Sequence, residues 1–115
     1  MAKLVQDVVD RKMIAVSPDS TIESARRLAG SSRISILPVI EKNKLVGILD
    51  IESIEGKSGA ERVRSAMREP IFVEQKTRLE DARKMIMEYR MPRLPVVESS
   101  ESMRCIGTVS SSDLI

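Results

Sequence analysis

The amino-acid sequence predicts a mixed α/β fold built from two tandem β-α-β-β-α units. Three observations lead to this prediction: the two halves of the 115-residue chain resemble each other, each half carries the same helix-start pattern, and short β-branched runs precede that pattern in both halves. A unit of about 50 residues buries too little apolar surface to be comfortable alone. We therefore expect the two units to pack sheet to sheet with pseudo-twofold symmetry and to share a core.

The repeat is clearest around the tripeptide Leu-Pro-Val, which occurs once in each half. A shift of 57 residues places 17–41 on 74–98 without a gap, and eight of these 25 positions are identical. Chance at average composition gives roughly one or two identities. Residues 45–54 and 105–114 then match at an offset of 60. The two halves are therefore duplicates of one unit.

The first unit is expected to span residues 1–57 and the second residues 58–115, with 55–62 as the linker. The linker contains Gly-Lys-Ser, the end of a phosphate-binding P-loop. The full P-loop pattern requires a glycine where this chain has Ile51, and it requires a long helix after the loop. We therefore do not interpret the linker as a P-loop.

Each unit is expected to contain one amphipathic helix. The capping-box pattern S/T-x-x-E occurs as Ser20 with Glu23 and again as Thr77 with Glu80. In this pattern the two side chains bond to the first free N–H groups of a helix. Apolar residues follow at three- and four-residue spacing in both copies, which gives each helix one apolar face.

The strands are predicted from short β-branched runs. Residues 13–17 and 70–74 are the expected first strands of the two units. Pro38 and Pro95 are expected to begin the second strands, where a missing N–H is tolerated.

A hairpin follows in each unit, with polar loops at 41–44 and 98–104. Gly47 and Gly107 lie in the third strands. A glycine inside a strand indicates that another backbone approaches closely at that point.

Residue counts exclude several kinds of chemistry. The chain has no histidine, which excludes Ser-His-Asp and Cys-His nucleophile systems and histidine-ligated metals. It has no tryptophan, one tyrosine and one phenylalanine, too few for a platform that stacks single-stranded nucleic acid. The net charge is +2 without a basic block, so a DNA-binding function is not expected. No motif combines paired carboxylates, histidine or a metal cluster, and we expect no enzymatic activity.

Cys105 is the single cysteine, so no intrachain disulfide forms, and its place at the head of an apolar run predicts a buried filler rather than a reactive thiol. No apolar run approaches the ~20 residues that a membrane span needs. The N-terminal residues lack the apolar stretch of a signal peptide, and we expect a cytoplasmic protein.

The tandem unit resembles a CBS (cystathionine β-synthase) domain pair, also called a Bateman module. The resemblance is carried by residues 5–9 and 63–67 before the first strands, by the apolar-x-Pro-Val turns, and by the closing pattern G-x-x-[ST]-x-x-D-[IL], which is complete at 107–114. It covers essentially the whole chain. It implies a disc with two clefts that commonly bind adenosine-containing ligands such as AMP, ADP or ATP, with no required cofactor.

We expect the stronger ligand site in the second unit. Pro95 offers a rigid apolar ring to the face of a purine, and the Asp113 carboxylate has acceptors for both ribose hydroxyls. Ser110 and Arg93 are placed to bind a phosphate. The remaining apolar residues form the other wall, where strand backbone groups contact the base edge. The full set of expected ligand-binding residues is Ile71, Val73, Arg93, Leu94, Pro95, Val96, Ser110 and Asp113.

Each of these polar residues and the proline also has a purely structural interpretation. A proline at a strand start is more often a boundary, and an aspartate in a run such as Ser-Ser-Ser-Asp is more often a helix cap. Arg93 taken alone is a solvated surface charge. The complete closing pattern favours the ligand role for Pro95 and Asp113 and leaves the role of Arg93 open.

The first unit is expected to form a weaker site, which is empty or takes an uncharged adenosine-like group. In the alignment Asp50 stands opposite Ser110, where a phosphate would lie. At ~4 Å and an effective dielectric of about 20, the repulsion between two negative charges is of order 4 kcal/mol. Ser53 stands opposite Asp113 and is too short to bind two ribose hydroxyls, which costs another ~1–3 kcal/mol. The residues of this weaker site are Ile14, Val16, Pro38, Val39, Asp50 and Ser53.

These features favour a regulatory module that senses an adenine nucleotide and acts on a separate effector protein. The alternative is a scaffold whose clefts are empty and whose helices mediate assembly. CBS pairs often form flat homodimers, and the helices expected at 20–30 and 77–90 leave an apolar edge that includes Met87 or Tyr89. We therefore predict a twofold homodimer, with core packing as the alternative role for the methionines of the second helix.

Overall fold

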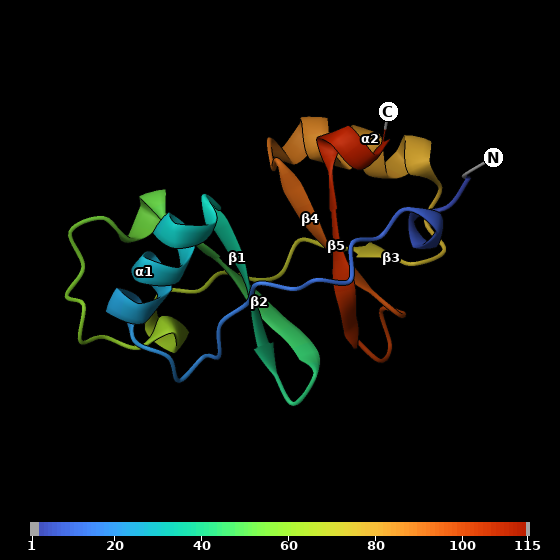
Figure 1. Cartoon of the computed structure of the whole chain (residues 1–115). Coiled ribbons are helices and arrows are strands. Elements are labelled where there is room, and N and C mark those ends of the chain that lie inside the picture. Colours follow the sequence, from blue (N-terminus) through green and yellow to red (C-terminus); the bar gives the residue numbers. More distant parts are fainter. Residues whose placement is uncertain (1–2, 115) are drawn as a thin grey trace. The chain divides into compact units, whose positions relative to one another are not determined.

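The structure of the chain, a computed structural model, describes residues 3–114. Within this range it contains two α-helices and two β-sheets, which confirms the mixed α/β fold (Figure 1). No helix in the range is long and apolar enough to cross a membrane. With η for a 3₁₀-helix, the elements in chain order are η1 Val5–Asp7, α1 Ile22–Ser32, β1 Ile36–Glu41, β2 Lys44–Asp50, η2 Glu52–Ile54, η3 Val63–Ser65, β3 Val73–Glu74, α2 Leu79–Tyr89, β4 Arg93–Val97, β5 Cys105–Ser110 and η4 Ser111–Leu114.

The chain forms two compact units. Residues 14–70 form one unit, and residues 71–114 form the other together with residues 3–13. The opening segments of the two sequence repeats, residues 3–13 and 58–70, therefore each pack with the other repeat. The expected boundary after residue 57 follows the sequence repeat, whereas the compact units follow a different division.

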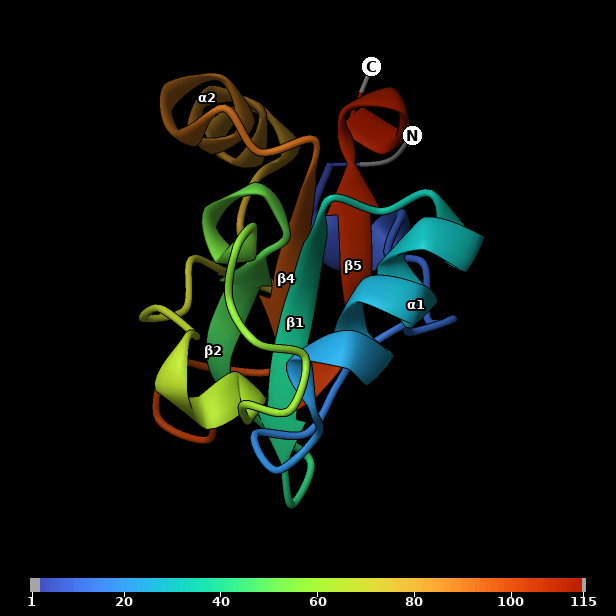
Figure 2. The same ribbon diagram turned by 90° about the vertical axis from the view of Figure 1, so that its left-hand side faces the viewer.

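In the 14–70 unit, α1 lies alongside the antiparallel hairpin of β1 and β2 (Figure 2). The hairpin turns through Lys42 and Asn43, whose φ angles of 51° and 68° suit the right-handed twist of the flanking strands. The apolar face of α1 expected from its spacing is buried. The core of the unit consists of Val16, Ile22, Ala25, Ala29, Leu37, Val39, Leu49, Ile54 and Val63.

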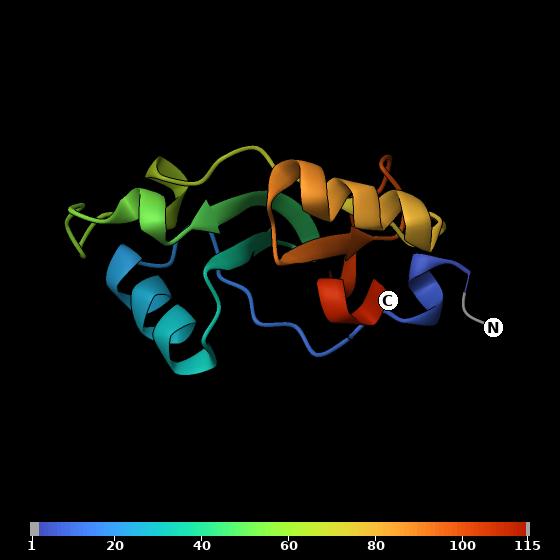
Figure 3. The ribbon, with the colours of Figure 1, turned by 90° about the horizontal axis from the view of Figure 1, so that it is seen from above.

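In the 71–114 unit, the sheet has the order β3-β4-β5. β3 runs parallel to β4, and β5 runs antiparallel to it. Helix α2 buries Ala82 and Ile86, and η4 lies beside α2 (Figures 1 and 3). The fully buried apolar residues of this unit are Val5, Ala82, Leu94, Val96, Val97, Val109 and Leu114.

The first strand of each unit is shorter than predicted. Val16 makes one isolated parallel bridge to Val39, and β3 contains only two residues. In this parallel pattern the next hydrogen bond toward the N-terminus would come from the N–H of Pro38 or Pro95, and proline has none. The prolines therefore end the pairing with the first strand. They do not begin the second strands, because β1 and β4 each start two residues before the proline.

The predicted capping boxes at Ser20 and Thr77 are wrong. The N-cap of α1 is Thr21, whose hydroxyl accepts a hydrogen bond from the Ser24 N–H at 3.1 Å. The N-cap of α2 is Arg78, which makes no side-chain cap. The hydroxyls of Ser20 and Thr77 instead accept from the N–H three residues earlier, at 3.2 Å in both units. These hydroxyls close the turn before the helix and are not available to cap it.

The opening segments of the two repeats dock in the same way. Asp10 exchanges two backbone hydrogen bonds with Thr108 in β5, each 2.9 Å long. Arg68 exchanges two with Ile48 in β2, at 2.9 and 3.0 Å. Each segment therefore extends the edge of a hairpin strand by one antiparallel bridge.

The glycines of the third strands make this docking possible. A Cβ on Gly47 would lie 2.8 Å from the carbonyl oxygen of Arg68, and a Cβ on Gly107 would overlap the carbonyl of Asp10. The close backbone approach that the sequence predicted is confirmed at both positions.

We expect Gly107→Ala to lower the free energy of unfolding by about 1–3 kcal/mol, because the added methyl group overpacks the contact with the opening segment. Gly30→Ala is the matched control, since a Cβ at this exposed position of α1 meets no atom within 4 Å. It should raise the free energy of unfolding by roughly 0.5–1 kcal/mol. Urea denaturation measures both values, and equal effects of the two substitutions would contradict this account.

Cys105 is buried, as expected, with its Sγ 3.4 Å from the Sδ of Met13. Burial raises the pKa of the Cys105 thiol because it disfavours the thiolate. We expect Cys105 to react with an aromatic disulfide reagent at pH 8 much more slowly in the native protein than in denaturant. The absorbance of the released thiolate measures both rates, and equal rates would show that the thiol is accessible in the folded state.

Candidate functional site

The closing pattern of the second repeat forms a hydrogen-bonded turn at the end of β5. The Asp113 carboxylate accepts from the N–H of Ser110 at 2.9 Å and from its hydroxyl at 3.0 Å. The hydroxyl of Ser110 also lies 2.8 Å from that of Ser112. The structure therefore brings together the two residues expected at the ribose and the phosphate.

Asp113 keeps acceptor capacity despite this local role. Both bonds from Ser110 end on Oδ2, and within residues 3–114 no hydrogen bond reaches Oδ1. A carboxylate offers about four lone-pair sites. Asp113 therefore has a local structural role as the third residue of η4, bonded to the residue before the helix, and this role leaves an oxygen that a diol can use.

The β4–β5 register places further expected residues on the same face. Arg93 pairs with Ser110, and Pro95 pairs with Thr108. Paired residues share a face and side chains alternate along a strand, so these four side chains lie on one face of the sheet. Arg93 is half-buried and donates to the Thr108 hydroxyl at 3.0 Å, and Pro95 is buried. Arg93 is therefore a fixed charge rather than a solvated one.

The other expected residues lie elsewhere. Leu94 and Val96 alternate with Pro95, so they occupy the opposite face of β4, and both are fully buried. Val73 pairs with Val96 and is 3% exposed, while Ile71 is half-buried. Because the side chains of Leu94 and Val96 are buried, only their backbone groups can contact a ligand.

The equivalent turn of the 14–70 unit has a different charge arrangement. Oδ1 of Asp50 accepts the N–H of Glu52 at 3.0 Å, and Oδ2 lies 4.0 Å from a guanidinium nitrogen of Arg68. Ser53 is exposed and donates its hydroxyl to the Asp50 carbonyl at 2.8 Å. Both side chains expected at the weaker site are thus engaged in the turn itself.

The apolar residues expected at the weaker site belong to the interior of the unit. Val16 and Val39 are members of the hydrophobic core, and Ile14 packs against it. Pro38 is buried.

Two arginines that support the closing turns were not recognised in the sequence. Arg83 of α2 donates from Nε to the Leu114 carbonyl at 2.9 Å, and a second nitrogen of its guanidinium contacts the same oxygen. Arg26 of α1 donates to the carbonyls of Ile54 and Lys57 at 2.7 and 2.8 Å. The available signal was that Arg26 and Arg83 are one of the identical pairs of the repeat.

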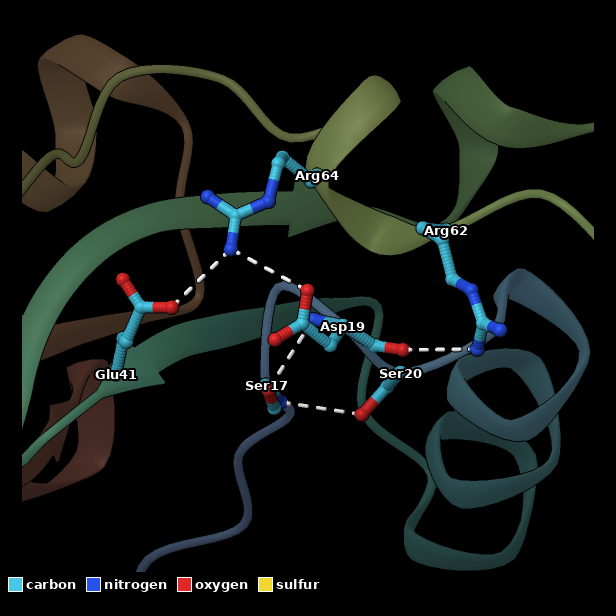
Figure 4. A network of polar contacts seen from close by, with 6 residues as sticks. All are labelled: Ser17, Asp19, Ser20, Glu41, Arg62 and Arg64. Carbon is cyan, nitrogen blue, oxygen red and sulfur yellow. Dashed lines mark hydrogen bonds and ion pairs between the residues drawn. The ribbon is translucent and has the colours of Figure 1, made fainter.

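A polar network ties the opening segment of the second repeat to the rest of the 14–70 unit (Figure 4). Arg64 contacts the carboxylates of Asp19 at 3.3 Å and Glu41 at 3.1 Å, and Arg62 donates to the Asp19 carbonyl at 3.0 Å. The hydrogen bond to Glu41, followed by that to Asp19, raises the pKa of Arg64. All these side chains are substantially exposed, so the network orients the segment more than it stabilises it.

No group of acidic or cysteine side chains within residues 3–114 is arranged to hold a metal ion. The chemistry that the 71–114 unit can offer is therefore hydrogen bonding and charge: a carboxylate oxygen, hydroxyl groups and one arginine beside a proline ring.

Two copies of one small α/β unit, each closed by a 3₁₀ turn, define a tandem α/β repeat protein. The chain belongs to the CBS domain family, because the family model for the CBS domain matches residues 5–55 and again residues 63–115. The resemblance found in the sequence is thus confirmed.

An inosine-5′-monophosphate dehydrogenase of Korarchaeum cryptofilum is 39% identical over 119 residues, which cover 99% of this chain and 25% of that enzyme. The chain spans between 23% and 44% of the first four curated relatives that it matches. Its similarity to these relatives is therefore confined to a part of each.

Two crystal structures extend the comparison. CBSX2 of Arabidopsis thaliana, solved in complex with AMP, is 26% identical, with a TM-score of 0.83 over 98% of this chain and 93% of that one. The CBS domains of a transcriptional regulator from Streptococcus pneumoniae give a TM-score of 0.86 over 96% of this chain and 95% of that one, at 19% identity. The second likeness shows the fold alone.

Proposed function

We propose that this chain is a regulatory module that binds an adenine nucleotide through its 71–114 unit. The single observation that carries the proposal is the closing turn, where Asp113 and Ser110 are bonded to each other. Arg93 and Pro95 lie on the same sheet face as Ser110. The AMP complex of CBSX2, a relative that this chain matches along almost its whole length, supports an adenosine-containing ligand.

The proposed roles follow from the chemistry of each group. Oδ1 of Asp113 accepts the ribose hydroxyls, and the guanidinium of Arg93 binds a phosphate. The Ser110 hydroxyl joins it by turning its proton from Asp113 to the phosphate. Pro95 contacts the purine ring. The base is bordered by the backbone of β4 at Leu94 and Val96, together with Ile71 and Val73.

We propose that the 14–70 unit binds a nucleotide more weakly. Arg68 offsets part of the Asp50 charge, so the repulsion of a phosphate is smaller than the ~4 kcal/mol of an unpaired carboxylate. Ser53 still lacks a second oxygen, and its hydroxyl is already bonded to a carbonyl. The difference in ribose binding therefore remains.

The proposed module is not an enzyme and acts on a separate effector protein. The relatives named as enzymes are matched over only 21% to 25% of their length, which is consistent with a regulatory part. The existence of a separate effector protein and a cytoplasmic location stay predictions from the sequence. A scaffold with empty sites is the alternative that the binding experiment below excludes or supports.

We expect one strongly bound nucleotide per chain, detected as thermal protection by one or more of AMP, ADP, ATP, S-adenosylmethionine and NAD. Titration calorimetry then gives the stoichiometry. Asp113→Ala should weaken binding at least about tenfold, because the charge-assisted bonds to the ribose are lost.

Asp81→Ala is the matched control, because it removes an exposed carboxylate from the same unit. It should leave the affinity unchanged. Two equal sites per chain, or full affinity in Asp113→Ala, would show that the site is assigned wrongly. Protection by none of the five compounds would support the scaffold.

We also propose a twofold homodimer that covers the exposed apolar residues of α2. Met87 is 74% exposed and Tyr89 is 48% exposed, and these are the large apolar side chains that the structure leaves exposed among residues 3–114. Light scattering at micromolar concentration should give twice the mass of the chain. Met87→Glu should shift the mass toward the monomer, whereas Ala60→Glu, an equal charge change in the exposed linker, should not. A monomeric wild type would contradict the proposal.

A further inference from the structure

The Arg83 side chain connects helix α2 to the turn that carries Asp113. Two guanidinium nitrogens of Arg83 contact the carbonyl oxygen of Leu114, the last residue of η4. Leu114 directly follows Asp113 and is fully buried. The guanidinium therefore holds the residue next to the carboxylate from a separate element of the fold.

The turn depends on such support for a physical reason. η4 is a 3₁₀-helix of four residues, with weaker hydrogen-bond geometry than an α-helix and with end carbonyls that have no partner inside it. A rigid arginine fork supplies donors from outside. Without it, the turn is held by the bonds of Asp113 to Ser110 and by one bond from the Ser111 N–H to the Pro92 carbonyl at 3.3 Å.

The repeat provides an internal comparison. Arg26 makes the same kind of contact to the carbonyl of Ile54, the last residue of η2, and also contacts the carbonyl of Lys57. The two copies therefore share the support although their closing turns differ in the residues at the proposed ligand positions. If the two arginines served folding alone, replacing either of them would have the same kind of effect.

We propose that Arg83 is a positioning residue for the ribose of the bound nucleotide and acts through Asp113. This inference rests on the nucleotide-binding function proposed above. Arg83 fixes the end of η4, and the fixed turn holds the Asp113 carboxylate ready to accept two hydroxyls at once. Without Arg83 the site is less preorganised. Loss of Arg83 therefore weakens the binding of a complete ribose more than the binding of a 2′-deoxyribose.

The experiment compares Arg83→Met with Arg26→Met in the full chain. Methionine keeps an apolar stem and removes all donors. We expect Arg83→Met to weaken AMP binding about tenfold by calorimetry, and to reduce the preference for AMP over 2′-deoxy-AMP to about one. Arg26→Met should keep the affinity for AMP and the preference for AMP over 2′-deoxy-AMP within about twofold of the wild type. Thermal melting of the two ligand-free variants provides the stability comparison.

Two further variants complete the test. Arg83→Lys, which retains one donor group for the Leu114 carbonyl, should restore part of the preference for AMP, and it serves if Arg83→Met does not fold. In Asp113→Ala, adding Arg83→Met should weaken AMP binding no further, because the group that Arg83 positions is gone.

The outcomes separate the two proposals. If the wild type binds AMP and Asp113→Ala loses it, but Arg83→Met and Arg83→Lys keep the wild-type preference, the inference about Arg83 alone is overturned. Equal weakening of AMP binding by Arg26→Met and Arg83→Met would show that Arg83 serves folding alone. That result would also overturn the inference about Arg83. A wild type that binds none of the nucleotides would overturn the proposed function and the inference together.

Discussion

The structure depends on a close backbone contact between each opening segment and the third strand of a hairpin. The two hydrogen bonds that Asp10 exchanges with Thr108 form only because Gly107 has no Cβ. The same holds for Arg68, Ile48 and Gly47 in the other unit. Since each contact joins the opening segment of one repeat to the body of the other, neither half of the sequence forms a compact unit by itself.

This contact also determines where the candidate site lies. β5 is held on one side by the opening segment and on the other by β4, so its register is fixed from both edges. That register brings Ser110 opposite Arg93 and starts the closing turn at the point where Asp113 bonds back to Ser110. The position of the carboxylate is therefore a consequence of sheet pairing as much as of the local motif.

Duplication has given the two units the same framework and different chemistry. The turns before the helices, the docked opening segments and the arginines behind the closing turns are equivalent in both units. Both aspartates are bonded within their own turns, but the turns differ in charge: Asp50 lies 4.0 Å from a guanidinium nitrogen of Arg68, whereas Asp113 forms no ion pair among residues 3–114. A pair of units that differ in this way can bind a ligand more strongly at one closing turn than at the other.

The sequence by itself determined the repeat, the apolar helix faces, the close approach at Gly107 and the burial of Cys105, because spacing and residue type act locally. It also placed Ser110 and Asp113 together, since they are three residues apart. Only the tertiary structure decided which repeat each opening segment joins, and that Arg83 contacts the carbonyl of Leu114. Hydrogen bonds between residues distant in the chain depend on where whole elements pack, and a local pattern carries no record of that.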